Sequence, residues 1–490
     1  MTAENVLAIL PEILILVLAG FVLLFDAVWP EERRRSLGWL TAGGLILILA
    51  VSIVAARPSD DPRFAFGGMI RDDWLGFTFR MAFLFGAAIT SLFAMDAKHL
   101  GKKGEFYLLL LVSTLGMNLM ASAGDLVMLY LAIETTSIPL YVLAGFVLND
   151  DKSTEAGFKY MLFGALTSAV MLYGFSLLYG FTGTTSLYEL AEKVRLGLVS
   201  DGALVGTLML ILVGFGFKIS AVPFHYWAPD VYEGAPTPVA GFLSTASKAA
   251  GFAVLMRVLL VAFNGEDVMH AWTTLIAAIS VITMTLGNTL ALAQKNIKRL
   301  LAYSSIAHAG YILIGLVAIS PEGPLNLGVQ SSVFYLIAYI VTNLTAFGVV
   351  AAYERVSGSN EIDSYKGLSR RSPGLALIMM VTMLSLAGMP PFGGFVAKVF
   401  VFAAAVETKT WTWLAVVGVL NAIIGLYYYL TVLKVVYLYR ADNPEDEQKP
   451  LPISRPYAIA LIVLTAGIIL IGTVFGPWFH WAGEAAKSLF

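Results

Sequence analysis

Long apolar stretches follow one another along almost the whole chain, with short polar connections between them. A helix that crosses a bilayer needs about 20 mostly apolar residues. The pattern therefore predicts an all-α membrane protein with about 14 transmembrane helices. The predicted spans lie at residues 4–28, 37–56, 74–95, 105–122, 125–148, 156–181, 203–222, 238–263, 271–292, 299–319, 329–353, 375–406, 412–439 and 456–481.

The composition leads to the same interpretation. Hydrophobic residues make up 58% of the chain and charged residues 13%, whereas soluble domains average about 25% charged residues. The net charge of −2 gives no basic surplus for nucleic acid, and the lack of cysteine excludes disulfides and thiolate ligands. The first apolar run has Glu4 and no preceding basic residue, so we expect a retained span, not a cleavable signal.

The distribution of lysine and arginine predicts the orientation. An even number of spans places both termini on the same side of the membrane. If that side is the outside, the inward loops hold 18 lysines and arginines and the outward segments hold 7. Because inward loops of membrane proteins are rich in these residues, we expect both termini on the outer side of a bacterial plasma membrane.

Two segments resemble each other and predict an internal repeat. FGFKISAVPFHYW (215–227) and LSLAGMPPFGGFVAKVF (384–400) are apolar helices interrupted by a Pro-Phe pair. The first lies in span 7, which runs inward, and the second in span 12, which runs outward. They therefore predict two inverted five-helix repeats, each with a broken helix, a feature typical of transport sites. The alternative is a pair of proline kinks without function.

The repeats predict how the chain is divided. We expect an N-terminal three-helix segment at residues 1–104 and a first repeat, containing spans 4–8, at residues 105–265. The second, inverted repeat is expected at residues 266–440, with spans 9–13. A last helix follows within residues 441–490. No connection between the spans is long enough for a soluble domain.

Four ionisable residues lie deep inside predicted spans: Glu134, Lys218, Lys248 and Lys398. A charge at the bilayer centre costs about 2.5–3.5 kcal/mol on insertion scales, so such residues are usually functional. Burial lowers the pKa of a lysine and a nearby carboxylate raises it, which suits proton exchange. We therefore expect the glutamate to pair with a lysine of another span and the row to relay protons. The alternatives are a protonated glutamate that bonds a neighbouring helix, and lysines that extend to the interface.

Other ionisable residues are less clear. His308 in span 10 is equally compatible with a relay and with a core histidine. Glu155 and Lys159 form an i,i+4 pair that is either an ordinary helix pair or a proton entry point. The remaining residues are His225 and Lys434, expected near the inner interface, Asp26 and Asp125, expected at span ends, and Arg80 and Arg257, for which interfacial and functional roles both stay open.

Four segments carry a resemblance to a known family. They are EAGFKYMLFGALTSAVMLYGFSLLYG (155–180), FHYWAPDVYEGAPTPVAGFLSTASKAAGFA (224–253), QKNIKRLLAYSSIAHAGYILIG (294–315) and SLAGMPPFGGFVAKVFVF (385–402). The chain resembles the antiporter-like membrane subunits of respiratory complex I over nearly its whole length. Lys398 favours the branch of this family that has a lysine on its second broken helix, since a related branch usually has a glutamate there.

The resemblance implies a function and a set of residue roles. The family moves protons across the membrane, driven by electron transfer from NADH to quinone in other subunits. By analogy, Glu134 and Lys218 would gate proton uptake, Lys248 would pass the proton on, and Lys398 would release it outward, with His308 as a further link. The implied partners are other membrane subunits, including antiporter-like paralogues. The resemblance implies no cofactor in this chain, and flavin and iron–sulfur clusters in partner subunits.

Three other functions are compatible with parts of the sequence. A subunit of a multisubunit cation/proton antiporter would share the repeat and the glutamate–lysine pair. A membrane redox enzyme with its own haem would need two histidines at facing depths, and the chain has five histidines, of which only His308 is clearly deep. A purely structural subunit would tolerate the loss of the buried charges.

Overall fold

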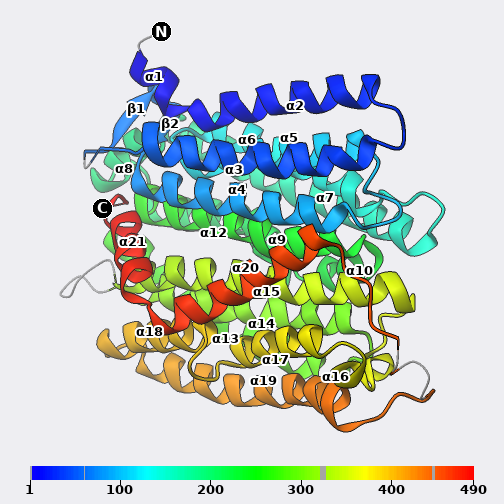
Figure 1. The fold of residues 1–490 in the computed structure, drawn as a ribbon. Coiled ribbons are helices and arrows are strands. Elements are labelled where there is room, and N and C mark those ends of the chain that lie inside the picture. Colours follow the sequence, from blue (N-terminus) through cyan, green and yellow to red (C-terminus); the bar gives the residue numbers. More distant parts are fainter. Residues whose placement is uncertain (1–2, 60, 320–326, 444–446, 448, 490) are drawn as a thin grey trace.

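The computed structural model describes residues 3–59, 61–319, 327–443, 447 and 449–489. Its helices lie side by side in one common direction (Figure 1). The elements of the first part of the chain are α1 (Ala3–Ala8), α2 (Leu10–Val28), η1 (Arg34–Ser36), α3 (Leu37–Ala55), β1 (Arg63–Ala65), η2 (Phe66–Gly68), β2 (Ile70–Asp72), α4 (Trp74–Ala94), α5 (Gly104–Ser122), α6 (Leu126–Ala144), α7 (Asp151–Thr182), α8 (Leu187–Arg195), α9 (Asp201–Ile219) and α10 (Trp227–Gly234).

One continuous helical rod follows and contains two π-helical turns, η3 and η4. Its parts are α11 (Thr237–Phe242), η3 (Leu243–Ser247), α12 (Lys248–Arg257) and η4 (Val258–Ala262). The remaining elements are α13 (Glu266–Ala291), α14 (Ile297–Val317), α15 (Leu327–Ser357), η5 (Ile362–Tyr365), α16 (Leu368–Arg371), α17 (Pro373–Ala387), α18 (Gly393–Glu407), α19 (Thr412–Leu438), α20 (Arg455–Thr473) and α21 (Gly476–Lys487).

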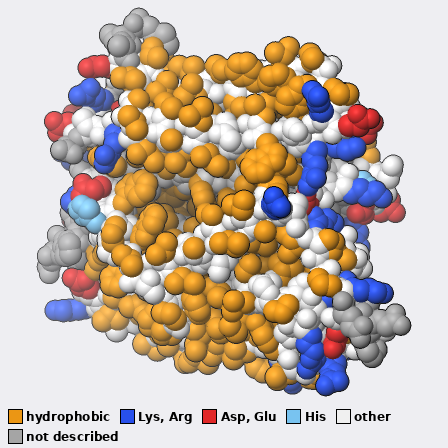
Figure 2. Space-filling model, viewed as in Figure 1, with side chains coloured by type: hydrophobic (Ala, Val, Ile, Leu, Met, Phe, Trp, Pro, Cys, Tyr) orange, Lys and Arg blue, Asp and Glu red, His pale blue; other side chains and the backbone are white. Residues whose placement is uncertain are grey.

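The predicted spans are confirmed with one change of form. Among the described residues, 13 helices are long and apolar enough to cross a membrane, and each corresponds to a predicted span. The remaining prediction, 375–406, is the broken pair α17 and α18. Charged side chains gather at two opposite edges of the molecule, and apolar side chains cover the face between them (Figure 2). This is the surface that a bilayer requires.

Two predicted spans end differently in the structure. The segment 4–28 is divided into α1 and α2, where Pro11 lies in the first turn of α2. The segment 456–481 is divided into α20 and α21, and Pro477 again occupies the first turn of the second helix. Proline has no backbone N–H and suits the start of a helix better than its interior. Apolar character alone did not reveal these breaks.

Both termini lie at the same end of the bundle, on the left in Figure 1. The antiparallel pair β1 and β2 lies there too, with Arg63 opposite Asp72. The C-terminal segment is tied to this end because Arg71 donates to the Ser488 carbonyl at 3.3 Å, and the Leu75 N–H donates to the Ser488 hydroxyl at 3.1 Å. The structure thus has a terminal end, which carries the hairpin, and an opposite end.

The two helix breaks share one backbone geometry. At the first, Ser220 has a φ of +58°, and the N–H of Ala221 donates to the Gly216 carbonyl at 2.8 Å. At the second, Gly388 has a φ of +87°, and the N–H of Met389 donates to the Leu384 carbonyl at 2.9 Å. A left-handed residue with a bond that spans six residues is a common helix ending. Each break lies close to a buried lysine, Lys218 at the first and Lys398 at the second.

The most buried helices lie in the middle of the molecule. The rod from α11 to η4 is entirely buried over its most apolar 18 residues, and α14 and α15 are 94% buried over theirs. The helices α2, α7 and α20 are only 33% buried over the same length and expose the rest. Polar side chains on the central helices are therefore shielded from lipid by the outer ones.

Candidate functional site

Glu134 lies in the middle of α6 and is half-buried. The hydroxyl of Ser168 on α7 donates to its carboxylate. Pro139 on the same helix frees the carbonyl of the residue four positions earlier. Thr135, Thr136 and Ser137 are near enough in the sequence to satisfy this carbonyl. Their hydroxyls donate instead to the carbonyls four residues before them, those of Leu131 at 2.7 Å, Ala132 at 2.9 Å and Ile133 at 2.5 Å.

Lys218 lies in the last turn of α9 and is 5% exposed. Its ammonium donates to the hydroxyl of Ser137 on α6 at 2.5 Å. Within the described part of the chain, no direct ion pair joins Lys218 to Glu134. The expected direct pair is thus replaced by an arrangement in which Ser137, three residues after Glu134, holds the lysine.

A small cavity adjoins these groups. Ser137, Ser168 and Lys218 are among the side chains that line it, and its volume is about 10 Å³. This is close to the smallest volume that holds one water molecule. The Glu134 carboxylate and the Lys218 ammonium thus each contact a serine hydroxyl, and the two serines line the same cavity.

Lys248 is the first residue of α12, directly after the π-helical turn η3, and is 2% exposed. Its ammonium donates to the hydroxyl of Ser305 on α14 at 2.6 Å and to the Ser305 carbonyl at 3.0 Å. The rod also meets Lys218, because a Cβ at Gly251 would lie 3.1 Å from the Lys218 Cβ. The first buried lysine thus packs one turn away from the second.

His308 follows Ser305 by one turn of α14 and is fully enclosed by aromatic side chains. Its Nδ1 lies 2.7 Å from the Tyr335 hydroxyl and its Nε2 lies 3.2 Å from the Tyr429 hydroxyl. Tyr429 also bonds the Ser304 hydroxyl at 2.5 Å. The histidine therefore belongs to a connected polar network and is more than an isolated core residue.

Lys398 lies on α18, past the second break, and is 5% exposed. Its ammonium donates to the carbonyls of Leu386 at 2.9 Å and Ala387 at 3.0 Å, at the C-terminus of α17. Free carbonyls at a helix end favour a cation. The ammonium also lies 5.1 Å from the centre of the Tyr311 ring, one turn beyond His308 on α14.

The structure therefore brings the predicted residues into one line across the buried helices. The line runs from Glu134 through Lys218 and Lys248 to His308 and Lys398. A second cavity of about 10 Å³ lies between His308 and the second break, with Tyr339 and Thr342 in its wall. Serine hydroxyls contact Glu134, Lys218 and Lys248, and tyrosine hydroxyls contact His308.

Arg257 and Arg80 each form a buried ion pair near the terminal end. Arg257 donates to both oxygens of Asp73, at 2.6 and 2.9 Å, and its side chain is 2% exposed. Arg80 lies 3.0 Å from Glu12 in a second buried ion pair. The structure thus gives both arginines, which the sequence left open, a buried partner. Asp125 caps α6, as expected, by accepting from the N–H of Val127 at 2.8 Å.

Lys434, Asp26 and His225 were expected near the interfaces or at span ends, and their side chains differ in exposure. Lys434 is exposed and lies 5.5 Å from the Tyr439 ring, as expected for a side chain that reaches the interface. Asp26 lies 3.7 Å from Arg34 near a helix end. His225 differs from the expectation, because it is only 3% exposed and lies within the first break.

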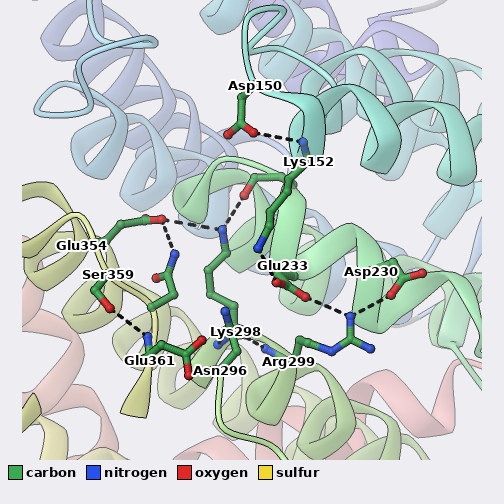
Figure 3. Close-up of polar contacts among 12 residues, drawn as sticks. Asp150, Lys152, Asp230, Glu233, Asn296, Lys298, Arg299, Glu354, Ser359 and Glu361 are labelled. Atoms are coloured by element: carbon green, nitrogen blue, oxygen red, sulfur yellow. Dashed lines mark hydrogen bonds and ion pairs between the residues drawn. The ribbon is translucent and has the colours of Figure 1, made fainter. Parts of the chain in front are cut away.

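Glu155 and Lys159 do form their pair, at 2.6 Å, but this pair belongs to a larger cluster at the opposite end of the molecule. Lys159 also binds Asp230 on α10 at 2.5 Å. Figure 3 shows that Arg299 of α14 reaches between Asp230 and Glu233. Asp230, Glu233 and Arg299 were not among the predicted residues, although two acids three residues apart that follow a helix break were a signal.

A polar recess opens at this end of the molecule. It has a volume of about 720 Å³, and its lining includes Asp96, Lys152, Glu233, Lys298 and Glu354. Its floor meets the start of α11, where the Thr237 hydroxyl donates to Glu354. The recess thus gives polar access to the end of the rod that carries Lys248.

The residues described above lie within a segment that matches a known protein family. The family model "NADH:quinone oxidoreductase/Mrp antiporter, TM" matches residues 123–425, which contain Glu134, Lys218, Lys248, His308 and Lys398. The chain belongs to this family.

Three similar proteins place the chain within the family. A protein of Moorella thermoacetica called NADH-quinone oxidoreductase subunit N is 42% identical over 481 residues, 98% of each chain. A chain of respiratory complex I from Thermus thermophilus, solved with bound aureothin, is 33% identical with a TM-score of 0.79, covering 96% of this chain and 98% of that one. A chain of the Mrp complex from Dietzia has a TM-score of 0.87 and 22% identity, covering 100% and 98%, and shares the fold.

Proposed function

We propose that the chain is the proton-translocating subunit N of an NADH-quinone oxidoreductase. The relative from Moorella carries this name and aligns over 98% of both chains, which supports the assignment. The observation that carries the proposal is the row of ionisable side chains inside the bundle, from Glu134 to Lys398, each of them held by hydroxyl or carbonyl groups. Ionisable residues inside a membrane are costly and usually functional, so a subunit with a purely structural role would not be expected to keep several of them.

Each residue of the line has a proposed role. Glu134 and Lys218 take up a proton and hold it through the hydroxyls of Ser137 and Ser168. Lys248 receives the proton and passes it, through Ser305, to the network around His308. Lys398 accepts it and releases it toward the terminal end. A hydroxyl both donates and accepts, so each one can hand on a proton without becoming charged.

The serine between Glu134 and Lys218 makes the pair adjustable. In this arrangement the ammonium donates to Ser137 and the carboxylate accepts from Ser168. A direct contact would hold both groups in their charged forms, because opposite charges stabilise each other. Contact and separation of the two groups would thus bind and release the lysine proton in turn. Electron transfer in other subunits would supply the energy for that change.

The orientation and the repeats are part of the proposal. We assign the terminal end to the outer side of a bacterial plasma membrane, in line with the bias of lysine and arginine toward the opposite end. We assign residues 105–265 and 266–440 to inverted repeats, each with one broken helix. The shared backbone geometry of the two breaks supports this assignment.

The partners are proposed from the same relationship. The chain assembles with other membrane subunits of the complex, including antiporter-like paralogues, and its exposed apolar surface faces them and the lipid. Flavin and iron–sulfur clusters are expected in partner subunits, which carry out the electron transfer. The chain itself contributes proton movement to this translocase.

The test compares variants of the buried line with a surface control. Lys218→Met, Lys248→Met and Lys398→Met each keep the length of the side chain and remove its charge. In inverted membrane vesicles with NADH as donor, each should lower proton translocation at least about tenfold, since a lost relay group leaves no partner of matching pKa. Lys434→Met at the surface should pump as the wild type does. Normal pumping by all three buried variants would refute the relay.

The alternative is a subunit of a multisubunit cation/proton antiporter, which the fold shared with the Dietzia chain makes worth testing. Purification of the chain with its natural partners separates the two functions. Flavin-containing and iron–sulfur subunits in the purified complex support the oxidoreductase. Small antiporter subunits alone support the alternative.

A further inference from the structure

Five charged residues form an alternating row at the end of the molecule opposite the termini. We call the row the charge chain: Lys159, Asp230, Arg299, Glu233 and Lys152. Neighbours in the row lie 2.5, 2.8, 2.9 and 2.8 Å apart, in that order. Arg299 is its centre, because one nitrogen of its guanidinium donates to both carboxylates (Figure 3).

The charge chain connects elements from the two parts of the molecule. Lys152 and Lys159 belong to α7, and Asp230 and Glu233 belong to α10, the short helix that follows the first break. Arg299 comes from α14, in the second part of the chain. The short helix is therefore held on one side by α7 and on the other by the helix that carries Ser305 and His308.

A second set of contacts connects α10 to Lys218. The indole N–H of Trp227, the first residue of α10, donates to the carbonyl of Phe217 at 3.0 Å, one residue before Lys218. The Trp227 ring stacks on Tyr160 of α7 with 4.4 Å between ring centres. Trp227 is 3% exposed, so this contact is shielded from water. A shift of α10 would therefore move the backbone next to the buried lysine.

We propose that Arg299 is a positioning residue for Lys218, acting through α10 and Trp227. The inference rests on the proposed function and names a part of the uptake step that the line of buried residues does not contain. Arg299 touches none of the residues of that line. It joins the position of Lys218 in the first repeat to α14 in the second, so that the two cannot shift independently.

The geometry predicts a selective effect when Arg299 is removed. Without it, Asp230 keeps Lys159 and Glu233 keeps Lys152, so each carboxylate retains an opposite charge on α7. The helix α10 then stays on the molecule but loses its ion pairs to α14, while the Lys298 ammonium of α14 still donates to the Ala235 carbonyl after α10 at 2.8 Å. Burial alone would raise the pKa of Asp230, but hydrogen bonds and charges from Lys159 and Arg299 hold it below the usual value. The carboxylate is thus ionised at neutral pH and available for these contacts.

The experiment uses the complete complex in inverted membrane vesicles and measures protons translocated and NADH oxidised. Trp227→Phe should lower pumping about 2- to 10-fold, the effect of one lost hydrogen bond. Arg299→Gln removes two charge-assisted bonds and should lower pumping at least as much. Arg299→Lys should recover most of the activity, because an ammonium still lies near both carboxylates. Arg370→Gln, which removes an exposed pair with Glu447 at 3.3 Å, is the matched control and should be unchanged.

The double variant decides whether the two residues act in one pathway. If Arg299 acts through Trp227, the double variant Arg299→Gln, Trp227→Phe pumps as well as the single variant with the lower pumping rate. Multiplied losses, or wild-type pumping by Arg299→Gln, would overturn the proposal. If Arg299→Gln fails to assemble, Trp227→Phe alone carries the test, and normal pumping by it overturns the proposal too. Lys218→Met is run in parallel: if it pumps normally, the proposed function fails first, whereas its loss beside a normal Arg299→Gln refutes the positioning role alone.

Discussion

Replacing Arg257 by methionine removes the centre of the buried cluster at the terminal end. The guanidinium donates to both oxygens of Asp73, to the Tyr188 hydroxyl at 3.1 Å and to the Ala121 carbonyl at 2.8 Å. Asp73 lies between β2 and α4, Tyr188 on α8 and Ala121 on α5. Together with α12, which carries Arg257, one side chain thus joins four segments. Methionine fills a similar space but makes none of these bonds.

The magnitude follows from what the substitution leaves behind. Removing one partner of a buried ion pair costs about 3–5 kcal/mol, because the other charge stays buried without compensation. Asp73 has no exposed side-chain surface, yet it keeps the Arg71 Nε at 3.2 Å and the Gly76 N–H at 2.8 Å. We therefore expect the lower end, a loss of about 3 kcal/mol in the free energy of unfolding.

The double variant Arg257→Met, Asp73→Asn should recover most of that loss. The asparagine carries no charge and its oxygen still accepts from Gly76, so the double variant should lie within about 1.5 kcal/mol of the wild type. Denaturant unfolding in detergent micelles measures the free energy of unfolding of the purified full-length wild type, of Arg257→Met, of Asp73→Asn and of the double variant. A single variant within about 1 kcal/mol of the wild type, or a double variant no more stable than the single one, would refute the reasoning.

Two further outcomes can be checked. Gly116→Ala should disturb the relay, because the new Cβ would lie 2.6 Å from the Thr136 backbone nitrogen and would push α5 away from α6 by a few tenths of an ångström or more. We expect lower proton pumping and a loss of about 1–3 kcal/mol in the free energy of unfolding. Gly180→Ala is the control, because its new Cβ meets nothing within 4 Å. For Asp96, burial raises the pKa, but polar neighbours, Arg355 among them, lower it below its usual value. Its stabilisation should therefore be complete above about pH 5 and lost as the pH falls below about 4, so the stability difference from Asp96→Asn should shrink in that range.

Most of the fold was predictable because lipid imposes a simple rule. Every span needs an apolar stretch of fixed minimum length, and the chain shows each of them. Short elements obey no such rule. The hairpin of β1 and β2 and the amphipathic helix α8 have no long apolar run, and the π-helical turns before Lys248 and after Arg257 have no known sequence signal in this pattern. None of these elements was predicted.

The position of the candidate residues inside the bundle was predictable, but their contacts were not. Depth alone selected Glu134, Lys218, Lys248 and Lys398, because charges far from both ends of an apolar helix are rare. It could not identify the partner of each, since that depends on how each helix is rotated. Lys218 accordingly binds Ser137 and not the carboxylate that the sequence analysis paired with it.

The spacing along α14 has an electrical consequence. Ser305, His308 and Tyr311 are successive turns of one helix face, six residues or about 9 Å from first to last. The hydrocarbon layer is about 30 Å thick, so a charge carried along this face would cross roughly a third of the voltage drop. At 100 mV that is about 0.7 kcal/mol out of 2.3 per elementary charge. Most of the work against the membrane potential would then fall on entry and exit, and not on the transfer between the two halves.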